Sequence, residues 1–269
     1  MDMGIIVAAA LVVGITGIVI GLLLGAAGNI FQVKTDERVA KIRDCLPGNN
    51  CGGCGYPGCD GLAEAIGKGE APVGACPVGG APVSAKIAAI MGVEDAAEMR
   101  MCAFVACAGT CAKVERHSVY DGIQGCAEAA AVPGRGGKSC QYGCMGYGTC
   151  VSVCPFGAIH IVDGVAAVDK EACRGCRKCV EACPNHLIQM VPFEATVHVR
   201  CSSPEKGKDV RAVCQTGCIG CSLCTKVCPS QAIHMEGSLA RISHELCTGC
   251  GACAEKCPAG VIFMERSDQ

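Results

Sequence analysis

The chain has 269 residues, of which 27 are cysteine, none is tryptophan and 3% are aromatic. Large side chains are so rare that an ordinary apolar core buries little area, and something else must hold the fold together. Cysteine at this density indicates either a disulfide scaffold or metal centres. The length, the odd cysteine count and the ligand-like spacings favour iron–sulfur clusters over disulfides, with zinc a distant third. The formal charge of −2, which ligated thiolates would make more negative, argues against a nucleic acid partner.

The first 33 residues predict a membrane anchor. No charged residue occurs between positions 3 and 33, and the apolar run is long enough to cross a bilayer as one helix. The basic residues that follow are Lys34, Arg38, Lys41 and Arg43. By the positive-inside rule they predict a single-pass protein of the cell membrane, with its N-terminus outside and its cluster domains on the cytoplasmic side. Glycine at every fourth position from 17 to 25 favours packing against other membrane subunits.

Residues 34–83 predict a small domain built around one [4Fe–4S] cluster. The candidate ligands have the spacing C-x2-C-x4-C-x16-C and are Cys51, Cys54, Cys59 and Cys76. Four thiolates suit such a cluster, and the intervening glycines let the backbone wrap closely around it. Cys45 precedes the motif by six residues and is not expected to be a ligand.

Residues 84–138 are expected to link two cluster regions. The cysteines of this segment are Cys102, Cys107, Cys111 and Cys126, and their spacing matches no ferredoxin run. They are candidates for an additional cluster, completed by a cysteine such as Cys140, Cys201 or Cys214. The alternative is that they are buried structural thiols, which pack as small hydrophobic side chains.

One array of eight cysteines occurs twice at a constant offset of 74 residues. The first copy consists of Cys140, Cys144, Cys150, Cys154, Cys173, Cys176, Cys179 and Cys183, and the second extends from Cys214 to Cys257. Such runs, closed by Cys-Pro, are typical of bacterial two-cluster ferredoxins. We expect ferredoxin module 1 at 139–191 and module 2 at 214–269, joined by an exposed connector at 192–213.

The expected fold class is α+β, with an N-terminal transmembrane helix, a small 4Fe–4S domain and two tandem, loop-rich two-cluster ferredoxin modules. In each module the first Cys-Pro is followed by alternating apolar residues around a turn. Asp163 and Gly164 form the turn in module 1, which is a strong hairpin signal.

The fourth cysteine of each ferredoxin run binds the other cluster of its module. In module 2 this rule predicts one set of Cys218, Cys221, Cys224 and Cys257, and another of Cys228, Cys247, Cys250 and Cys253. In module 1 it joins Cys154 to Cys173, Cys176 and Cys179.

The other run of module 1 is irregular, because Tyr147 occupies the place of Cys221 in module 2. Cys140 is a candidate to complete the set of Cys144, Cys150 and Cys183. Alternatively, Cys140 and its repeat mate Cys214 both serve another site, which leaves three cysteines at this cluster. The sequence thus predicts at least five [4Fe–4S] clusters, or six or seven if the extra cysteines are ligands.

The order of these features resembles the B subunit of the Rnf complex, the ion-translocating ferredoxin:NAD+ oxidoreductase of bacterial membranes. The resemblance rests on the apolar anchor, on the motif LPGNNCGGCGYPGC at 46–59 with Cys76, and on the ferredoxin runs, so it covers nearly the whole chain. It implies a subunit that accepts electrons from soluble reduced ferredoxin and relays them into the complex. It also implies that other membrane subunits reduce NAD+ and translocate Na+ or H+. The simplest members have one ferredoxin module, whereas this chain has two, like a longer clostridial-type member.

Other functions compete with an electron relay. The chain could be the iron–sulfur subunit of another membrane reductase, or an enzyme with its own substrate at an incompletely ligated cluster. A zinc-stapled scaffold without a redox role is a third alternative. No Ser/His/Asp, Cys/His or paired-carboxylate arrangement indicates an independent catalytic site, and His160 and His234, at equivalent strand positions, are interpreted as structural.

Overall fold

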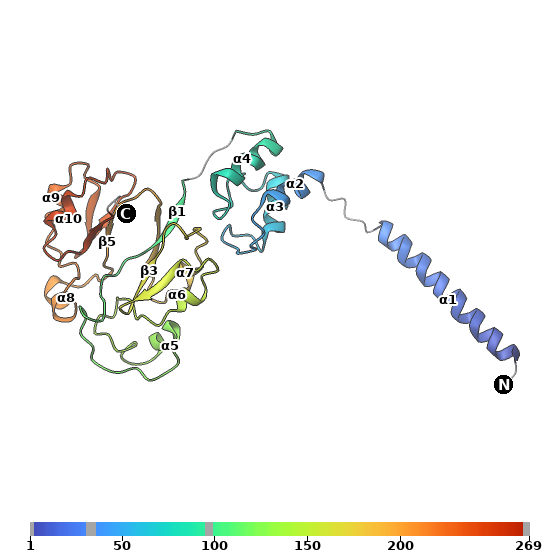
Figure 1. The fold of residues 1–269 in the computed structure, drawn as a ribbon, viewed down its shortest axis with the longest axis horizontal. Coiled ribbons are helices and arrows are strands. Elements are labelled where there is room, and N and C mark those ends of the chain that lie inside the picture. The colour runs from blue at the N-terminus through green and yellow to red at the C-terminus, as the bar shows by residue number, and fades with distance from the viewer. Residues whose placement is uncertain (1–2, 31–35, 95–98, 266–269) are drawn as a thin grey trace.

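The computed structural model describes residues 3–30, 36–94 and 99–265. Beyond the first helix, Figure 1 shows a small helical domain followed by two ferredoxin-like modules that lie side by side. The described residues form four antiparallel sheets of two strands each, together with short helices. This agrees with the α+β part of the predicted fold class.

Helix α1 (Met3–Ile30) precedes these domains and extends away from them (Figure 1). Within the part of the chain that the structure describes, no helix reaches the length and hydropathy that a membrane crossing requires. This contradicts the transmembrane helix predicted for the fold class and its use as a single-pass anchor. Residues 31–35, including the Lys34 of the topology prediction, lie outside the described residues.

The helical domain consists of α2 (Glu37–Cys45), α3 (Cys59–Lys68) and α4 (Gly80–Met91). Ile42, Leu62 and Ile87 from the three helices are at most 1% exposed and meet in one core. The loop that carries the cysteine motif joins α2 to α3. Its Asn50 side chain accepts a hydrogen bond from the Cys59 N–H at 2.8 Å, which fixes the start of α3. Because α2 and α3 both pack in this core, the two ends of the loop that carries the motif are held in place.

Module 1 contains helices α6 (Thr149–Ser152) and α7 (Lys178–Ala182) and the predicted hairpin of β2 (Ile159–Val162) and β3 (Val165–Val168). Asp163 and Gly164 have φ values of 46° and 73°, the left-handed geometry of a tight hairpin turn. Strand β4 (Ile188–Pro192) pairs with β1 (Met101–Val105). The segment expected to link two cluster regions thus contributes a strand to this module.

Module 2 repeats the arrangement. Its hairpin is β6 (Ile233–Glu236) with β7 (Leu239–Ile242), and its helices are α9 (Leu223–Val227) and α10 (Ala252–Lys256). Strand β8 (Ile262–Met264) pairs with β5 (Val197–Val199), which lies in the expected connector together with α8 (Gly207–Val213). In both modules a strand that precedes the cysteine array therefore pairs with the last strand of the module.

The strand pairing shows where the two modules differ in length. Ala103 pairs with Met190, and Val197 pairs with Met264. Met190 and Met264 are 74 residues apart, whereas Ala103 and Val197 are 94 residues apart. Module 1 therefore has 20 more residues between its first strand and its first array cysteine. These residues belong to a long segment at 108–139, which contains α5 (Cys126–Ala131) and is called here the insertion.

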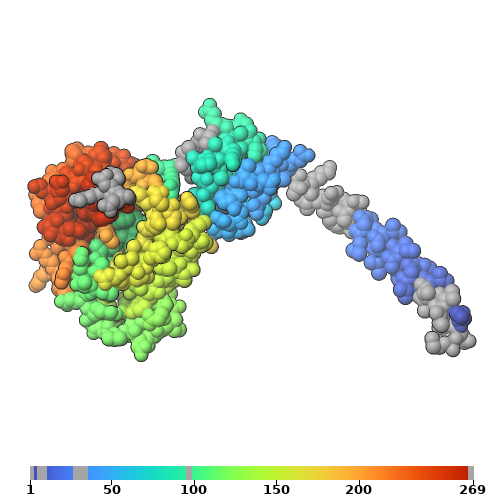
Figure 2. All heavy atoms as spheres, viewed as in Figure 1, coloured from blue at the N-terminus to red at the C-terminus, as the bar shows by residue number. Residues whose placement is uncertain are grey.

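Contacts join the two modules and attach the helical domain to module 1. The Thr216 Oγ1 atom of module 2 donates to the Ala108 carbonyl at 3.2 Å, and Ser202 Oγ donates to the Ala106 carbonyl at 3.1 Å. The helical domain lies against module 1, as Figure 2 shows. At that contact a Cβ added to Gly53 would lie 2.9 Å from the Cys176 carbonyl oxygen, so only glycine permits so close an approach. The domains that carry the cysteines thus form a continuous row.

Candidate iron–sulfur cluster sites

Two of the predicted ligand sets each line one cavity. Cys218, Cys221, Cys224 and Cys257 line a cavity in module 2, and Cys154, Cys173, Cys176 and Cys179 line another in module 1. The short helices that carry the third cysteine of each run follow a residue with positive φ, such as Arg177 at 63° and Ser222 at 55°. This left-handed residue turns the chain sharply, so that cysteines before and after it face the same cavity.

A third cavity, in module 1, is lined by Cys126, Cys144, Cys150 and Cys183. Cys140, the candidate for completing this set, does not line it. Cys126 comes from the insertion, so four cysteines face the cavity although Tyr147 occupies the position of Cys221. The open coordination position that would suit an enzyme with its own substrate is thus not a feature of this cavity.

Hydrogen bonds hold the insertion against module 1. Tyr147 donates its hydroxyl hydrogen to the Gly136 carbonyl at 2.7 Å, and the Cys126 N–H donates to Thr149 Oγ1 at 2.8 Å. The Arg135 guanidinium donates to the Asn185 side-chain oxygen at 2.6 Å. Tyr147 therefore does more than replace a cysteine, because it helps to anchor the segment that brings Cys126 to the cavity.

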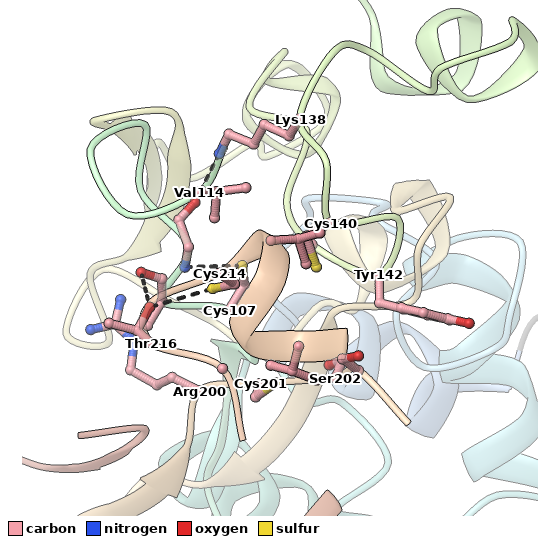
Figure 3. Close-up of a pocket in the computed structure, with 17 residues that line it drawn as sticks. Cys107, Val114, Lys138, Cys140, Tyr142, Arg200, Cys201, Ser202, Cys214 and Thr216 are labelled. Atoms are coloured by element: carbon pink, nitrogen blue, oxygen red, sulfur yellow. Dashed lines mark hydrogen bonds between the residues drawn. The ribbon is translucent and has the colours of Figure 1, made fainter. Parts of the chain in front are cut away.

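A fourth cavity lies between the modules and is lined by Cys107, Cys140, Cys201 and Cys214 (Figure 3). The two cysteines from each module occupy equivalent places. Cys107 and Cys201 both follow the first strand of their module, and Cys140 and Cys214 are mates at the 74-residue offset. The Cys144 N–H donates to Cys107 Sγ at 3.3 Å, and the Cys218 N–H donates to Cys201 Sγ at 3.3 Å. The cavity is thus built by an approximate internal symmetry.

The remaining predicted sets lie in the helical domain and in module 2. In the helical domain, Cys54 and Cys59 lie close enough to Cys76 for their thiolate charges to raise its pKa, after the larger effect of burial. In module 2, burial raises the pKa of Cys253, and nearby Cys228 and Cys247 add to the effect. Cys250 is exposed, and Cys51 is half-buried near Cys176. The structure therefore brings together the main members of both sets.

The donor set and its surroundings fit [4Fe–4S] clusters. Burial raises the pKa of Cys140 and Cys224 to about 11 and that of Cys150 and Cys179 to about 12. Neighbouring cysteines add to each shift, so each cavity needs a positively charged group before its four thiols can ionise together. Backbone N–H groups also point at cysteine sulfurs, as from Gly79 to Cys76, Ala103 to Cys173 and Leu187 to Cys183, each at 3.4 Å. Such bonds are among the features that set cluster potentials.

Among the described residues, no group of three or more metal-binding side chains is placed to hold a single metal ion. Three cysteines, namely Cys45, Cys102 and Cys111, belong to none of the six groups described above.

Family models match most of the region after α1. Residues 46–78 match the family described as "Putative Fe-S cluster". Residues 135–184 match one family described as "4Fe-4S dicluster domain", and residues 172–232 and 217–261 match a second family with the same description. The matched segments contain the helical-domain motif and both cysteine arrays, so the chain contains several 4Fe–4S domains.

Curated relatives are similar over most of the chain. The B subunit of the Na(+)-translocating ferredoxin:NAD(+) oxidoreductase complex of Acetobacterium woodii is 44% identical, over 87% of this chain and 70% of its own length. The B subunit of the ion-translocating oxidoreductase complex of Methanosarcina acetivorans is 41% identical, over 74% of this chain and 75% of its own. The B subunit of the proton-translocating ferredoxin:NAD(+) oxidoreductase complex of Clostridium ljungdahlii is 38% identical, over 87% and 83% respectively.

Proposed function

Because this chain belongs to the B subunits of ion-translocating ferredoxin:NAD+ oxidoreductase complexes, we propose that it relays electrons through six [4Fe–4S] clusters held by 24 of its cysteines. It is an electron-transfer iron–sulfur subunit of such a complex. Each bound cluster accepts and releases one electron at a time.

The proposed ligand sets are one in the helical domain, two in module 1, two in module 2 and one between the modules. They are Cys51, Cys54, Cys59 and Cys76; Cys126, Cys144, Cys150 and Cys183; Cys154, Cys173, Cys176 and Cys179; Cys107, Cys140, Cys201 and Cys214; Cys218, Cys221, Cys224 and Cys257; and Cys228, Cys247, Cys250 and Cys253. The observation that carries the proposal is that four separate cavities are each lined by four cysteines, and no cysteine is shared between them.

The arrangement of the domains supports a route from module 2 to the helical domain. The cavity between the modules has two cysteines from each, so a cluster there connects the two modules. At the other end of module 1, Cys176 contacts Gly53, which lies between Cys51 and Cys54 of the helical domain. We propose that soluble reduced ferredoxin delivers electrons at module 2 and that they leave from the helical domain towards partner subunits. The partners reduce NAD+ and translocate the ion, which requires that the complex operate at a membrane.

Electron uptake from ferredoxin tests this function. The full chain, purified without oxygen and reconstituted with iron and sulfide, is mixed with chemically reduced ferredoxin. We expect the visible absorption of the subunit's clusters to bleach and the EPR signals of reduced [4Fe–4S] clusters to appear. A matched control uses C221S and C250S together, which removes one exposed ligand from each cluster of module 2, and it should slow reduction by ferredoxin more than reduction by dithionite. A fully assembled chain that takes no electrons from reduced ferredoxin would refute the proposal.

A further inference from the structure

Lys138 is a buried lysine that forms no ion pair with a carboxylate of the described residues. Only 5% of the surface of Lys138 is exposed. Its Nζ atom donates to three backbone carbonyl oxygens, those of Gly109 at 2.9 Å, Cys144 at 3.0 Å and Gly164 at 2.7 Å. These bonds use all three hydrogens of the ammonium group. No ion pair within the described part of the chain includes this side chain.

The position of Lys138 relates it to two of the cavities. It lines the cavity between the modules, at one side of the cysteines in Figure 3. Its contact with the Cys144 carbonyl also places it beside a residue of the cavity that Cys126 completes. The two cavities adjoin at this point, because the Cys144 N–H donates to Cys107 Sγ. Lys138 therefore lies in the wall that separates them.

An uncompensated ammonium group is costly to bury, and carbonyl dipoles offset only part of the lost hydration. A [4Fe–4S] cluster with four thiolate ligands is anionic. With a cluster in each cavity, the missing negative charge is present on both sides of Lys138. Away from bulk water the interaction is only weakly screened, so a cation here acts strongly on both clusters. The burial of Lys138 thus has an explanation in the charge of its proposed neighbours.

We propose that Lys138 tunes the electron relay: its fixed positive charge raises the reduction potentials of the clusters in these two cavities. Reduction adds one electron to a cluster and leaves Lys138 unchanged, and the cation stabilises the added negative charge. The inference rests on the ligand sets proposed above. Its effect is asymmetric, because the equivalent position at the 74-residue offset is Ala212, an exposed residue of α8.

The test compares three substitutions in the full chain with assembled clusters. K138M removes the charge at similar size, K138Q removes it but keeps an amide donor, and K138R keeps it. The matched control is K113Q, because Lys113 is an exposed lysine of the same insertion, where water screens its charge. Iron content is measured first, to show that about 24 iron atoms per chain are bound. Potentials are then measured by EPR-monitored redox titration.

In K138M or K138Q we expect up to two of the six titrating components to move to more negative potential, while the others stay in place. K138R and K113Q should resemble the parent. A neutral variant with full iron and unshifted potentials would overturn the proposal, and so would a K138R shift equal to that of K138M.

If both neutral variants lose about eight iron atoms and K138R keeps them, the charge is needed for assembly, which supports the proposal. Loss of that iron in all three would show a purely structural role and overturn it. A parent chain without the six-cluster iron content would instead refute the ligand sets.

Discussion

Single residues decide which cysteines face each cavity. Tyr147 removes one cysteine from the regular run of module 1, and its hydroxyl group binds the insertion that supplies Cys126. Cys140 is left for the cavity between the modules, where its repeat mate Cys214 also lies. The loss of one ligand and the gain of another are therefore linked through the same segment.

Serine substitutions separate the two possible roles of Cys126 and Cys140. C126S should lose about four iron atoms by disrupting the cluster within module 1, because the oxygen is a poorer ligand than the thiolate. C140S should lose a similar amount from the other site, and C126S/C140S should lose about eight. Iron and sulfide analysis measures these losses. C111S is the control, because Cys111 is exposed and lines none of the four cavities. Equal iron in C126S and the parent would contradict the assignment.

Two of the non-ligand cysteines should differ in reactivity. Burial, as the largest cause, raises the pKa of Cys102 to about 11, so at pH 8 its thiol stays protonated and unreactive. Cys111 is exposed and accessible to reagents. When the protein with assembled clusters is treated with iodoacetamide, mass spectrometry should find Cys111 alkylated and Cys102 unmodified. Unfolding the chain after removal of the clusters is the control and should make both react. Rapid alkylation of Cys102 in the folded protein would show that the strand β1 opens readily.

At the scale of elements, two strands connect segments that are far apart in the sequence. β1 pairs with β4, and β5 pairs with β8, so each module is closed by a strand that lies before its cysteine array. Cys107 and Cys201 follow these strands directly and reach the cavity between the modules for that reason. The pairing of β1 with β4 gives the insertion a fixed start on module 1.

The contact of the helical domain with module 1 depends on Gly53. A Cβ at this position would meet the Cys176 backbone at 2.9 Å, and backbone atoms cannot move aside cheaply. G53V should therefore push the domains apart and slow electron transfer to the cluster of the helical domain, while iron content stays unchanged. Stopped-flow absorption with reduced ferredoxin would show a smaller fast phase. G55A is the control for backbone strain in the same loop, because Gly55 has a φ of 84°, which alanine rarely adopts, whereas an added Cβ meets no atom within 4 Å there. A normal fast phase in G53V would place the electron path elsewhere.

At the scale of the whole molecule, local spacing predicted the cysteine sets that line two of the cavities, whereas pairing between distant segments brings together the cysteines of the other two. The ligand sets that contain Cys173 and Cys218 could be predicted from spacing alone, because a regular ferredoxin run takes its fourth cysteine from the other run of the same module. Cys126 and Cys107 follow no run, and their places depend on the insertion and on β1. The sequence contains a trace of the insertion, since Cys107 and Cys201 are 94 residues apart, 20 more than the 74-residue offset of the cysteine arrays. The equivalence of these two cysteines is recognised only after the strand pairing has aligned the modules.

The transmembrane prediction was wrong. It rested on the apolar composition of the first residues, whereas no helix among the described residues meets the requirements of a membrane crossing. The α+β modules were predicted correctly because their turn and cysteine patterns are specific. Asp163 and Gly164 form the expected tight turn, with the left-handed backbone that such a turn requires.

The central claim, that the chain holds six four-cysteine clusters, is tested most directly by the iron and acid-labile sulfide content of the full chain purified without oxygen. The account predicts about 24 iron atoms and about 24 sulfides per chain, with a loss of about four of each in C107S. About 20 iron atoms in the parent and no further loss in C107S would contradict the site between the modules. Zinc without sulfide would contradict the electron relay itself.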